Sequence, residues 1–492
     1  MFCTKSRRVV SKMYDVVIIG GGIVGSSVAY YLSKYQLKTV LLEADNDISN
    51  GTTKANSAII HAGYDPEEGT LMAFHNVRGA RLAKELCAKL DVPYKQCGAM
   101  VIGFDEDDEK MVHTLYERGL ANGVEGLEIL DGKTVQKLEP CVSDKVTCAL
   151  LAKTSAIVSP WEYALALAET AVRNGVEVKL NNRVTAISRN GEAFTVTTVK
   201  GKYECRYIIN CAGLYADKVH QMIGEKEFKI IPSRGQYYLL DKAEGRRVSR
   251  TVFQCPTKDG KGVLVSPTVH GNLIVGPDAE DNDDFSVATT TEGLNFVRNA
   301  SKKSIPTVDF RENIRNFAGV RAKSDRPDFI LEESRSVKNF YNIAGIKSPG
   351  LSSAPSLALE AVQWLRSKGE QLKEKDNFID ERKRIRFKEL SGEEKQELIR
   401  KEPAYGRVIC RCETITEGEI LNALRTPIPA VSIDGVKRRC NAGMGRCQGG
   451  FCSERVAEIL MKELHLDGLE VLQDKEGSNV LVDYSKGGSS NV

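Results

Sequence analysis

The feature that most constrains this chain is a glycine turn between a short apolar strand and an apolar helix. Tyr14–Ile19 is β-rich, Gly20, Gly22 and Gly25 follow in a G-x-G-x-x-G pattern, and Ile23–Leu32 reads as a buried helix. This order opens a doubly wound α/β domain. The glycines permit a tight turn, the approach of a pyrophosphate to the backbone, and close packing of helix on strand. The pattern predicts a dinucleotide site.

An acidic residue and a polar loop extend this site. Glu43 ends the second predicted strand, where a carboxylate accepts hydrogen bonds from ribose hydroxyls. The loop 51–57 (GTTKANS) and a second turn after a strand, NCAG at 210–213, add groups that can face a cofactor. Their distribution suits FAD, a large nucleotide wrapped by several segments. The residues concerned are Thr52, Thr53, Asn56, Ser57, Ala212 and Gly213.

Composition narrows the class of protein. A chain of 492 residues predicts two to three domains. Its formal net charge of +3 gives no basic field for nucleic acid. Its apolar runs fall short of the roughly 20 residues that a membrane span needs. We therefore expect a cytoplasmic protein in which the basic segment 1–12 is a disordered extension. The alternative is that this segment is a targeting signal that directs the protein to an organelle matrix.

Cysteine spacing predicts one metal site near the C-terminus. Cys410 and Cys412 are followed, after 34 residues, by Cys447 and Cys452. Four thiolates suit a [2Fe–2S] cluster or Zn²⁺ equally by ligand count. The spacing leaves room for one small helix, and Cys440 lies outside the pattern.

Helix signals accompany the thiols. A Thr416–Glu419 capping box precedes the small helix, and Cys452 leads directly into a helix at Ser453–Leu464. A helix N-terminus supplies backbone N–H groups to an anionic cluster.

These signals predict a domain order. The fold class is α/β, with a Rossmann-like nucleotide domain interleaved with a mostly antiparallel β substrate domain, and a small α-rich metal domain at the end. The predicted ranges are 1–12 for the extension, 13–368 for the interleaved domain, 369–404 for a charged linker, 405–467 for the metal domain and 468–492 for a tail, which we expect to be frayed from Lys475 onward.

A resemblance enters at residues 50–65, which read NGTTKANSAIIHAGYD. Further stretches are PSRGQYYLLD (232–241), KGVLVSPTVHGNLIVGP (261–277), GVRAKSDRPDF (319–329) and AGIKSPGLSSAPSLA (344–358). In this order they resemble the FAD oxidoreductase superfamily typified by D-amino acid oxidase. Within it the chain is most similar to glycerol-3-phosphate oxidases and dehydrogenases and to L-2-hydroxyglutarate oxidases, over residues 14–368.

The resemblance assigns roles to single residues. His61 matches the active-site histidine beside the flavin, where an imidazole can take a hydroxyl proton. Arg321 matches the arginine that holds the substrate anion. Lys261 is the second cation, although Lys258 lies close enough in sequence to be confused with it. Without the resemblance, His61 reads as a hydrogen-bonded loop residue and Arg321 as a surface ion pair.

Four further positions follow from the same resemblance. Ser348, Gly350 and Leu351 match the segment that approaches the flavin ring, although a plain turn explains Ser348 taken alone. Val184 matches a backbone contact with the adenine. The cysteine pattern, with AGMGRCQGGFC at 442–452, resembles the bacterioferritin-associated ferredoxin module, whose cofactor is a [2Fe–2S] cluster.

Three functions are compatible with these features. The first is FAD-dependent oxidation of glycerol 3-phosphate to dihydroxyacetone phosphate, with electrons passed through the [2Fe–2S] cluster to a protein acceptor such as a second flavoprotein. The second is the same chemistry on a 2-hydroxy acid, such as L-2-hydroxyglutarate, or on an amino acid. The third is a non-catalytic carrier of electrons between a flavin and the cluster.

Overall fold

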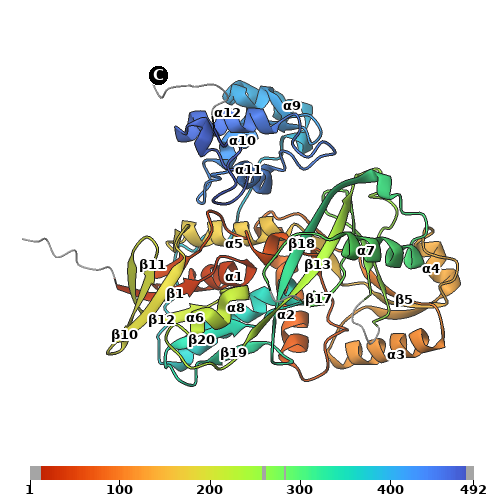
Figure 1. The fold of residues 1–492 in the computed structure, drawn as a ribbon, viewed down its shortest axis with the longest axis horizontal. Coiled ribbons are helices and arrows are strands. Elements are labelled where there is room, and N and C mark those ends of the chain that lie inside the picture. The colour runs from red at the N-terminus through yellow and green to blue at the C-terminus, as the bar shows by residue number, and fades with distance from the viewer. Residues whose placement is uncertain (1–12, 257–261, 282–283, 484–492) are drawn as a thin grey trace, which may run out of the picture.

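The structure is a computed structural model that describes residues 13–256, 262–281 and 284–483. Two sheet-based units lie side by side, and a small helical module sits above them (Figure 1). Among the described residues, no helix is both long enough and apolar enough to cross a bilayer. The predicted extension 1–12 lies outside the described residues.

The nucleotide unit is built on an eight-stranded sheet with a parallel centre. Strands β9, β2, β1, β12 and β20 run parallel in that spatial order, and an antiparallel hairpin and β19 complete it. The central strands are buried on both faces, which explains their continuous apolar sequence. The strands are β1 (Met13–Ile19), β2 (Thr39–Leu42), β9 (Glu177–Lys179), β10 (Val184–Asn190), β11 (Ala193–Thr198), β12 (Lys202–Asn210), β19 (Ile330–Glu333) and β20 (Phe340–Ala344).

Small side chains let helices approach this sheet and one another. Helices α1 (Ile23–Leu32), α5 (Pro160–Arg173) and α8 (Gly350–Ser367) share one buried core with the parallel strands. The helix predicted at Ile23–Leu32 is confirmed to the residue. α2 (Leu71–Lys89) joins the group so tightly that a Cβ on Gly79 would lie 2.3 Å from the carbonyl oxygen of Ser352.

The substrate unit is a nine-stranded sheet that is antiparallel except where β5 meets β14. Its longest pairing joins β13 and β18, and places Ser233 opposite Arg321. The strands are β5 (Ala99–Gly103), β6 (Leu127–Asp131), β7 (Cys148–Ala152), β13 (Ile230–Leu240), β14 (Thr251–Gln254), β15 (Leu264–Pro267), β16 (Leu273–Gly276), β17 (Glu280–Asp281) and β18 (Asn313–Ser324). The accompanying helices are α3 (Glu106–Ala121), α4 (Gly132–Leu138) and α7 (Thr291–Ser304).

The two units are interleaved along the chain, as predicted. Segments of the substrate sheet at 99–152 and 230–324 interrupt those of the nucleotide sheet. A three-stranded sheet of β3 (Ile59–Ile60), β8 (Ala156–Val158) and β4 (Tyr94–Lys95) lies beside the crossings, and a short helix, α6 (Ala216–His220), follows β12. The fold is therefore the expected α/β architecture with a mostly antiparallel second sheet.

The C-terminal module has its own core of buried aliphatic side chains and cysteines. The capping box predicted at Thr416–Glu419 is confirmed, and a second capping box is present at Ser391–Glu394. The expectation of one small helix between the thiol pairs is wrong, because Ser432 caps a second helix there. The elements are α9 (Gly392–Lys401), β21 (Val408–Cys410), β22 (Ile415–Thr416), α10 (Glu417–Ala423), α11 (Ile433–Cys440) and α12 (Ser453–Leu464).

The charged segment before the module is tied to the nucleotide unit. Arg382 and Glu169 form a buried ion pair at 2.9 Å, Arg384 pairs with Glu162, and Arg386 pairs with Asp91 at 2.7 Å. Glu162 and Glu169 both lie on α5. Because these ion pairs hold the segment 382–386 against the nucleotide unit, the segment fixes the position of the module that follows it.

The module also continues past its predicted end at Asp467. Val471 is buried in the module's core, and the backbone N–H of Val480 donates to the carbonyl oxygen of Val471. The predicted tail therefore begins inside folded structure, because its charge and glycine content hide one apolar anchor.

Candidate active site and cluster site

The glycine turn is shaped by close backbone contacts. A Cβ on Gly25 would lie 1.9 Å from the carbonyl oxygen of Gly20, so any side chain there would push α1 away from β1. Gly22 is the N-cap of α1, and with Ile23 and Val24 it places the N-terminus of this helix at the wall of a cavity. A helix N-terminus of this kind binds phosphate.

Glu43 lies directly beside this turn. Its carboxylate accepts hydrogen bonds from the backbone N–H groups of Gly21 at 2.5 Å and of Asp45 at 2.8 Å. Burial raises the pKa of Glu43 to about 7, against the opposing effect of these two N–H donors. Ribose hydroxyls that donate to the carboxylate would favour its ionised form.

The polar loop predicted to face phosphate mostly supports the protein itself. Thr53 Oγ1 accepts from the backbone N–H of Ile23 at 2.9 Å, and Thr52 Oγ1 donates to the carbonyl oxygen of Val320 at 2.6 Å. Asn56 donates to carbonyl oxygens of the same loop, and Ser57 Oγ lies 3.3 Å from the hydroxyl of Tyr237. The loop is held rigid between the two units, and its side chains are engaged before any ligand binds.

One cavity of about 1880 Å³ joins these features to the predicted catalytic residues. It exceeds the roughly 300–1,000 Å³ of an ordinary small-ligand site. A cavity of this size, lined by both the glycine turn and the predicted catalytic residues, suits an extended dinucleotide with a substrate at one end. The predicted residues that line it are Gly20, Gly22, Glu43, Thr52, Thr53, Asn56, Ser57, His61, Val184, Ala212, Gly213, Arg321, Ser348, Gly350 and Leu351.

His61 meets Ser348 across this cavity. The Nε2 atom of His61 lies 3.4 Å from Ser348 Oγ, and its ring centroid lies 5.8 Å from that of Phe253. The backbone of His61 is fixed on both sides, because its N–H donates to Ser352 Oγ at 2.8 Å and its carbonyl accepts from Asn76 at 2.6 Å. Residues far apart in sequence thus hold one imidazole in a defined place.

Arg321 enters the cavity from β18. Its guanidinium donates to the carbonyl oxygens of Arg234 and Asp278, both at 3.2 Å. A Cβ on Gly235 would lie 2.4 Å from Arg321 Nη2, so only glycine leaves room for the guanidinium. A guanidinium has five N–H donors, and these two bonds to neutral carbonyls leave donors for an anion. Lys261, predicted as the second cation, lies outside the described residues.

The four predicted ligand cysteines of the module gather as two pairs. Cys412 Sγ and Cys447 Sγ are 3.6 Å apart, close to the roughly 3.8 Å between two thiolates on one tetrahedral ion with bonds of about 2.3 Å. A hydrogen bond from the Cys452 thiol lowers the pKa of Cys410 to about 6, and the same bond raises the pKa of Cys452.

A pairwise arrangement matches a two-iron cluster, in which each iron takes two thiolates. Cys440 stands apart, because its thiol donates to the carbonyl oxygen of Val436 at 3.3 Å. Burial raises the pKa of Cys440 to about 12, which keeps it protonated.

The comparisons with known proteins agree with this geometry. The family described as FAD dependent oxidoreductase matches residues 15–364. The chain belongs to this family. A second family, described as BFD-like [2Fe-2S] binding domain, matches residues 408–462, which hold all four paired thiols. FAD and a [2Fe–2S] cluster are therefore the cofactors of this oxidoreductase.

Individual relatives narrow the resemblance. A glycerol 3-phosphate dehydrogenase of Caloramator mitchellensis is 50% identical over 476 residues, which cover 96% of this chain and 99% of the relative. The human mitochondrial L-2-hydroxyglutarate dehydrogenase is 32% identical over 56% of this chain and 63% of its own length. The solved L-α-glycerophosphate oxidase of Mycoplasma pneumoniae, with FAD bound, has a TM-score of 0.72 and is 31% identical over 75% of this chain and 98% of its own.

Sequence reasoning missed one wall of the cavity. Residues of the C-terminal module line it together with the nucleotide turn, namely Asp434, Lys437, Arg438, Met444, Gln448, Asp474 and Lys475. No local signal in the sequence marks this wall: arginines in a small module are normally exposed, and only the structure shows that Arg438 and Arg439 are buried.

Proposed function

We propose that this chain oxidises glycerol 3-phosphate to dihydroxyacetone phosphate and passes the electrons to its own [2Fe–2S] cluster. The observation that carries the proposal is the near full-length similarity to a glycerol 3-phosphate dehydrogenase, which spans both the flavin unit and the cluster module. When bound, FAD supplies a hydride acceptor, and the cluster supplies a one-electron acceptor.

The protein's part in the reaction is to bind an anion and to take a proton. We propose that Arg321 pairs with the phosphate group as a planar fork of donors, and that Lys261 adds a second charge. His61 Nε2 then accepts the proton of the C2 hydroxyl as the hydride leaves the same carbon. Ser348 Oγ, 3.4 Å from this nitrogen, helps to orient the imidazole or the hydroxyl.

The remaining predicted residues are proposed to hold the cofactors. The turn at Gly20, Gly22 and Gly25 and the carboxylate of Glu43 bind the adenosine diphosphate half of FAD. The flavin half would contact the loop of Thr52, Thr53, Asn56 and Ser57 and the segments of Ala212, Gly213, Ser348, Gly350 and Leu351, with Val184 at the adenine. Cys410, Cys412, Cys447 and Cys452 are the proposed iron ligands.

A carboxylate substrate is the second candidate, favoured by the similarity to the L-2-hydroxyglutarate dehydrogenase. Arg321 can serve either anion. Anaerobic mixing of the holoenzyme with glycerol 3-phosphate, L-2-hydroxyglutarate, glycine or proline separates the candidates by the initial rate at which flavin absorbance bleaches. We expect glycerol 3-phosphate to be fastest, and faster bleaching by L-2-hydroxyglutarate would transfer the assignment.

We also propose a protein electron acceptor, such as a second flavoprotein, and a cytoplasmic location. A fused cluster supports the first, because an oxidase that reduces O₂ needs only its flavin. The described cysteines support the second, since none forms a disulfide. Cell fractionation tests the location, and co-purification followed by cluster reoxidation tests the acceptor.

A further inference from the structure

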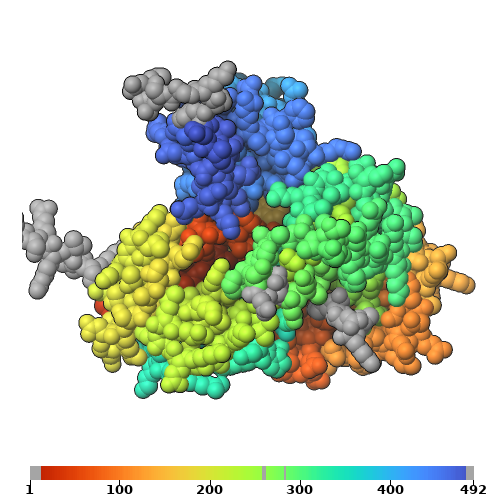
Figure 2. Space-filling model, viewed as in Figure 1, coloured from red at the N-terminus to blue at the C-terminus, as the bar shows by residue number. Residues whose placement is uncertain are grey.

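The iron–sulfur module covers one side of the FAD cavity. In Figure 2 the module, in blue, overhangs an opening whose floor is formed by N-terminal residues, in red. Lys437, Met444 and Gln448 of the module line the same cavity as the glycine turn. Met444 and Gln448 lie on either side of the cluster ligand Cys447 in sequence, so the loop that holds this ligand forms part of the cavity wall.

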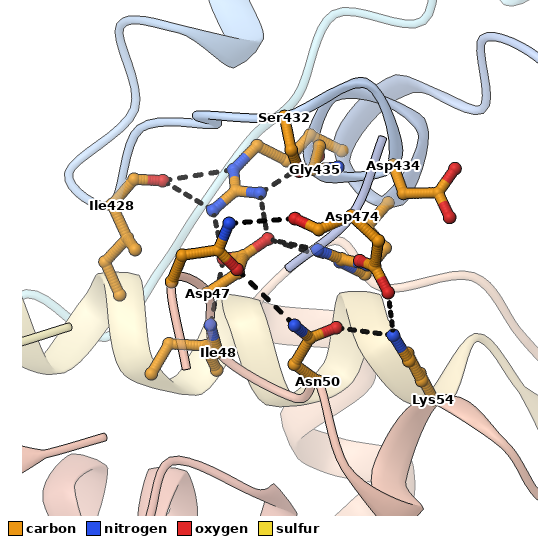
Figure 3. Close-up of polar contacts among 12 residues, drawn as sticks. Asp47, Ile48, Asn50, Lys54, Ile428, Ser432, Asp434, Gly435 and Asp474 are labelled. Atoms are coloured by element: carbon orange, nitrogen blue, oxygen red, sulfur yellow. Dashed lines mark hydrogen bonds and ion pairs between the residues drawn. The ribbon is translucent and has the colours of Figure 1, made fainter. Parts of the chain in front are cut away.

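On one side of the cavity, the module contacts a buried acidic residue of the nucleotide unit, Asp47. Asp47 accepts hydrogen bonds from Arg439 at 2.8 and 2.9 Å and from Arg438 at 2.9 and 3.2 Å (Figure 3). All three side chains are at most 5% exposed. Although burial opposes ionisation, the two guanidinium groups hold the pKa of Asp47 below its usual value.

Asp474 adds a second contact from the module to the same loop. Its carboxylate accepts from Arg438 at 2.7 Å and pairs with Lys54, whose ammonium also donates to Asn50 at 2.5 Å. The carbonyl oxygen of Asp474 accepts from Asn46 at 2.8 Å (Figure 3). Asn46, Asp47 and Lys54 of one loop thus all contact the module.

The loop that carries Asp47 and Lys54 is also part of the FAD site. It begins just after Glu43, and the backbone N–H of Ser49 donates to the carbonyl oxygen of Gly21 at 3.0 Å. At its far end Thr53, next to Lys54, holds the N-terminus of α1. A single short loop therefore contacts both the dinucleotide turn and the module.

On the other side of the cavity, the module contacts the substrate unit. Arg446, next to Cys447, pairs with Glu312 at 2.9 Å, and Glu413, next to Cys412, accepts from Lys242 at 2.6 Å. Lys242 follows β13 and Glu312 precedes β18. The module is thus anchored on both sides of the opening.

We propose that the iron–sulfur module completes the FAD site, and that the Asp47–Arg438–Arg439 contact is a latch that couples docking of the module to retention of FAD. Such coupling is reciprocal: if docking of the module tightens FAD binding, bound FAD must favour docking to the same extent. The inference requires only that FAD is bound, so it holds whichever anion is oxidised.

The test is the rate of FAD release from the holoenzyme, followed by flavin fluorescence after dilution into an excess of a flavin-binding trap. Asp47→Asn leaves two buried guanidinium groups without their counter-ion, and we expect release to be faster by on the order of 100-fold. Asp474→Asn weakens the latch from the module side at a less buried position, and we expect about a tenfold increase.

The control is Arg425→Gln, which removes exposed ion pairs to Glu402 and Glu463 within the same part of the chain. We expect its release rate to stay within about twofold of the unmodified protein. Asp474→Asn keeps the test decisive if Asp47→Asn does not fold. Unchanged release in a folded Asp47→Asn protein, or in Asp474→Asn when Asp47→Asn is unfolded, would overturn the proposal.

A second readout does not depend on mutation. Because the coupling is reciprocal, removal of FAD from the unmodified holoenzyme should speed amide hydrogen exchange in α11, while α3 of the substrate unit keeps its protection. Equal exchange of α11 with and without FAD would show that docking and cofactor binding are independent.

Discussion

The flavin cavity and the thiol site are built in opposite ways. The cavity draws its walls from segments spread between residues 19 and 475, and its imidazole and guanidinium groups meet only after both sheets form. The four thiols come from one short stretch, within a module that has its own core. Substrate chemistry therefore depends on long-range packing, whereas cluster binding depends on local spacing. Mutations should separate the two.

The largest expected effect is the loss of the cluster without loss of substrate oxidation. Cys412→Ser removes one ligand of the close Cys412–Cys447 pair, and we expect iron and electron flow to an acceptor to be lost completely. With FAD in excess, bleaching by substrate should persist. Cys440→Ser is the matched control and should retain its iron. Iron analysis and visible spectra distinguish them, and full iron content in Cys412→Ser would contradict the ligand assignment.

A change at His61 should have the opposite result: substrate oxidation is lost while the cluster is retained. His61→Asn removes the proposed base, and we expect bleaching of flavin by substrate to slow by roughly 10²–10⁴-fold with the cluster unchanged. His113→Asn, at an exposed position of α3, is the control and should behave as the unmodified protein. Stopped-flow absorbance gives both rates. An unaltered rate in His61→Asn would favour the interpretation of the chain as a carrier rather than a catalyst.

A smaller effect is expected from the anion site. Arg321→Met removes charge-assisted hydrogen bonds, each worth about 1.5–3 kcal/mol, so the apparent substrate affinity should fall by roughly 10–100-fold. Arg321→Lys should retain part of it, because a point charge replaces a fork. Arg311→Met, whose side chain is 89% exposed, is the control. Equal affinity in all three proteins would place the anion elsewhere.

The smallest effect concerns pH. Because Glu43 has a pKa raised to about 7 by burial, it is largely protonated in mild acid and ionised in mild base. Ribose hydroxyls donate to the ionised form, so FAD affinity should rise by up to about tenfold between about pH 6 and about pH 8. Glu43→Gln should abolish this dependence, and exposed Glu192→Gln should keep it. Titration of apoprotein with FAD measures the effect.

Local sequence was sufficient for the elements next to each motif. The strand, glycine turn and helix at 14–32 and the helix after Cys452 were predicted closely, because apolar periodicity and capping residues act within a few positions. The second small helix between the thiols, capped by Ser432, was missed because it is only eight residues long and its last turn is a run of three basic residues, which hides its buried face.

Long-range geometry could not be derived in this way. The meeting of His61 with Ser348 was suggested only by resemblance to a family, since 287 positions separate them. The contact between Asp47 and Arg438–Arg439 was not foreseen at all, because nothing in either local pattern marks an ion pair as buried and shared between two modules.

The most direct test of the account is an anaerobic mixture of holoenzyme and glycerol 3-phosphate, followed by optical absorbance and by electron paramagnetic resonance of rapidly frozen samples. The account predicts that flavin absorbance bleaches first and that the signal of a reduced [2Fe–2S] cluster then grows at the expense of reduced flavin. Bleaching with a cluster that stays oxidised, or no bleaching at all, would contradict it.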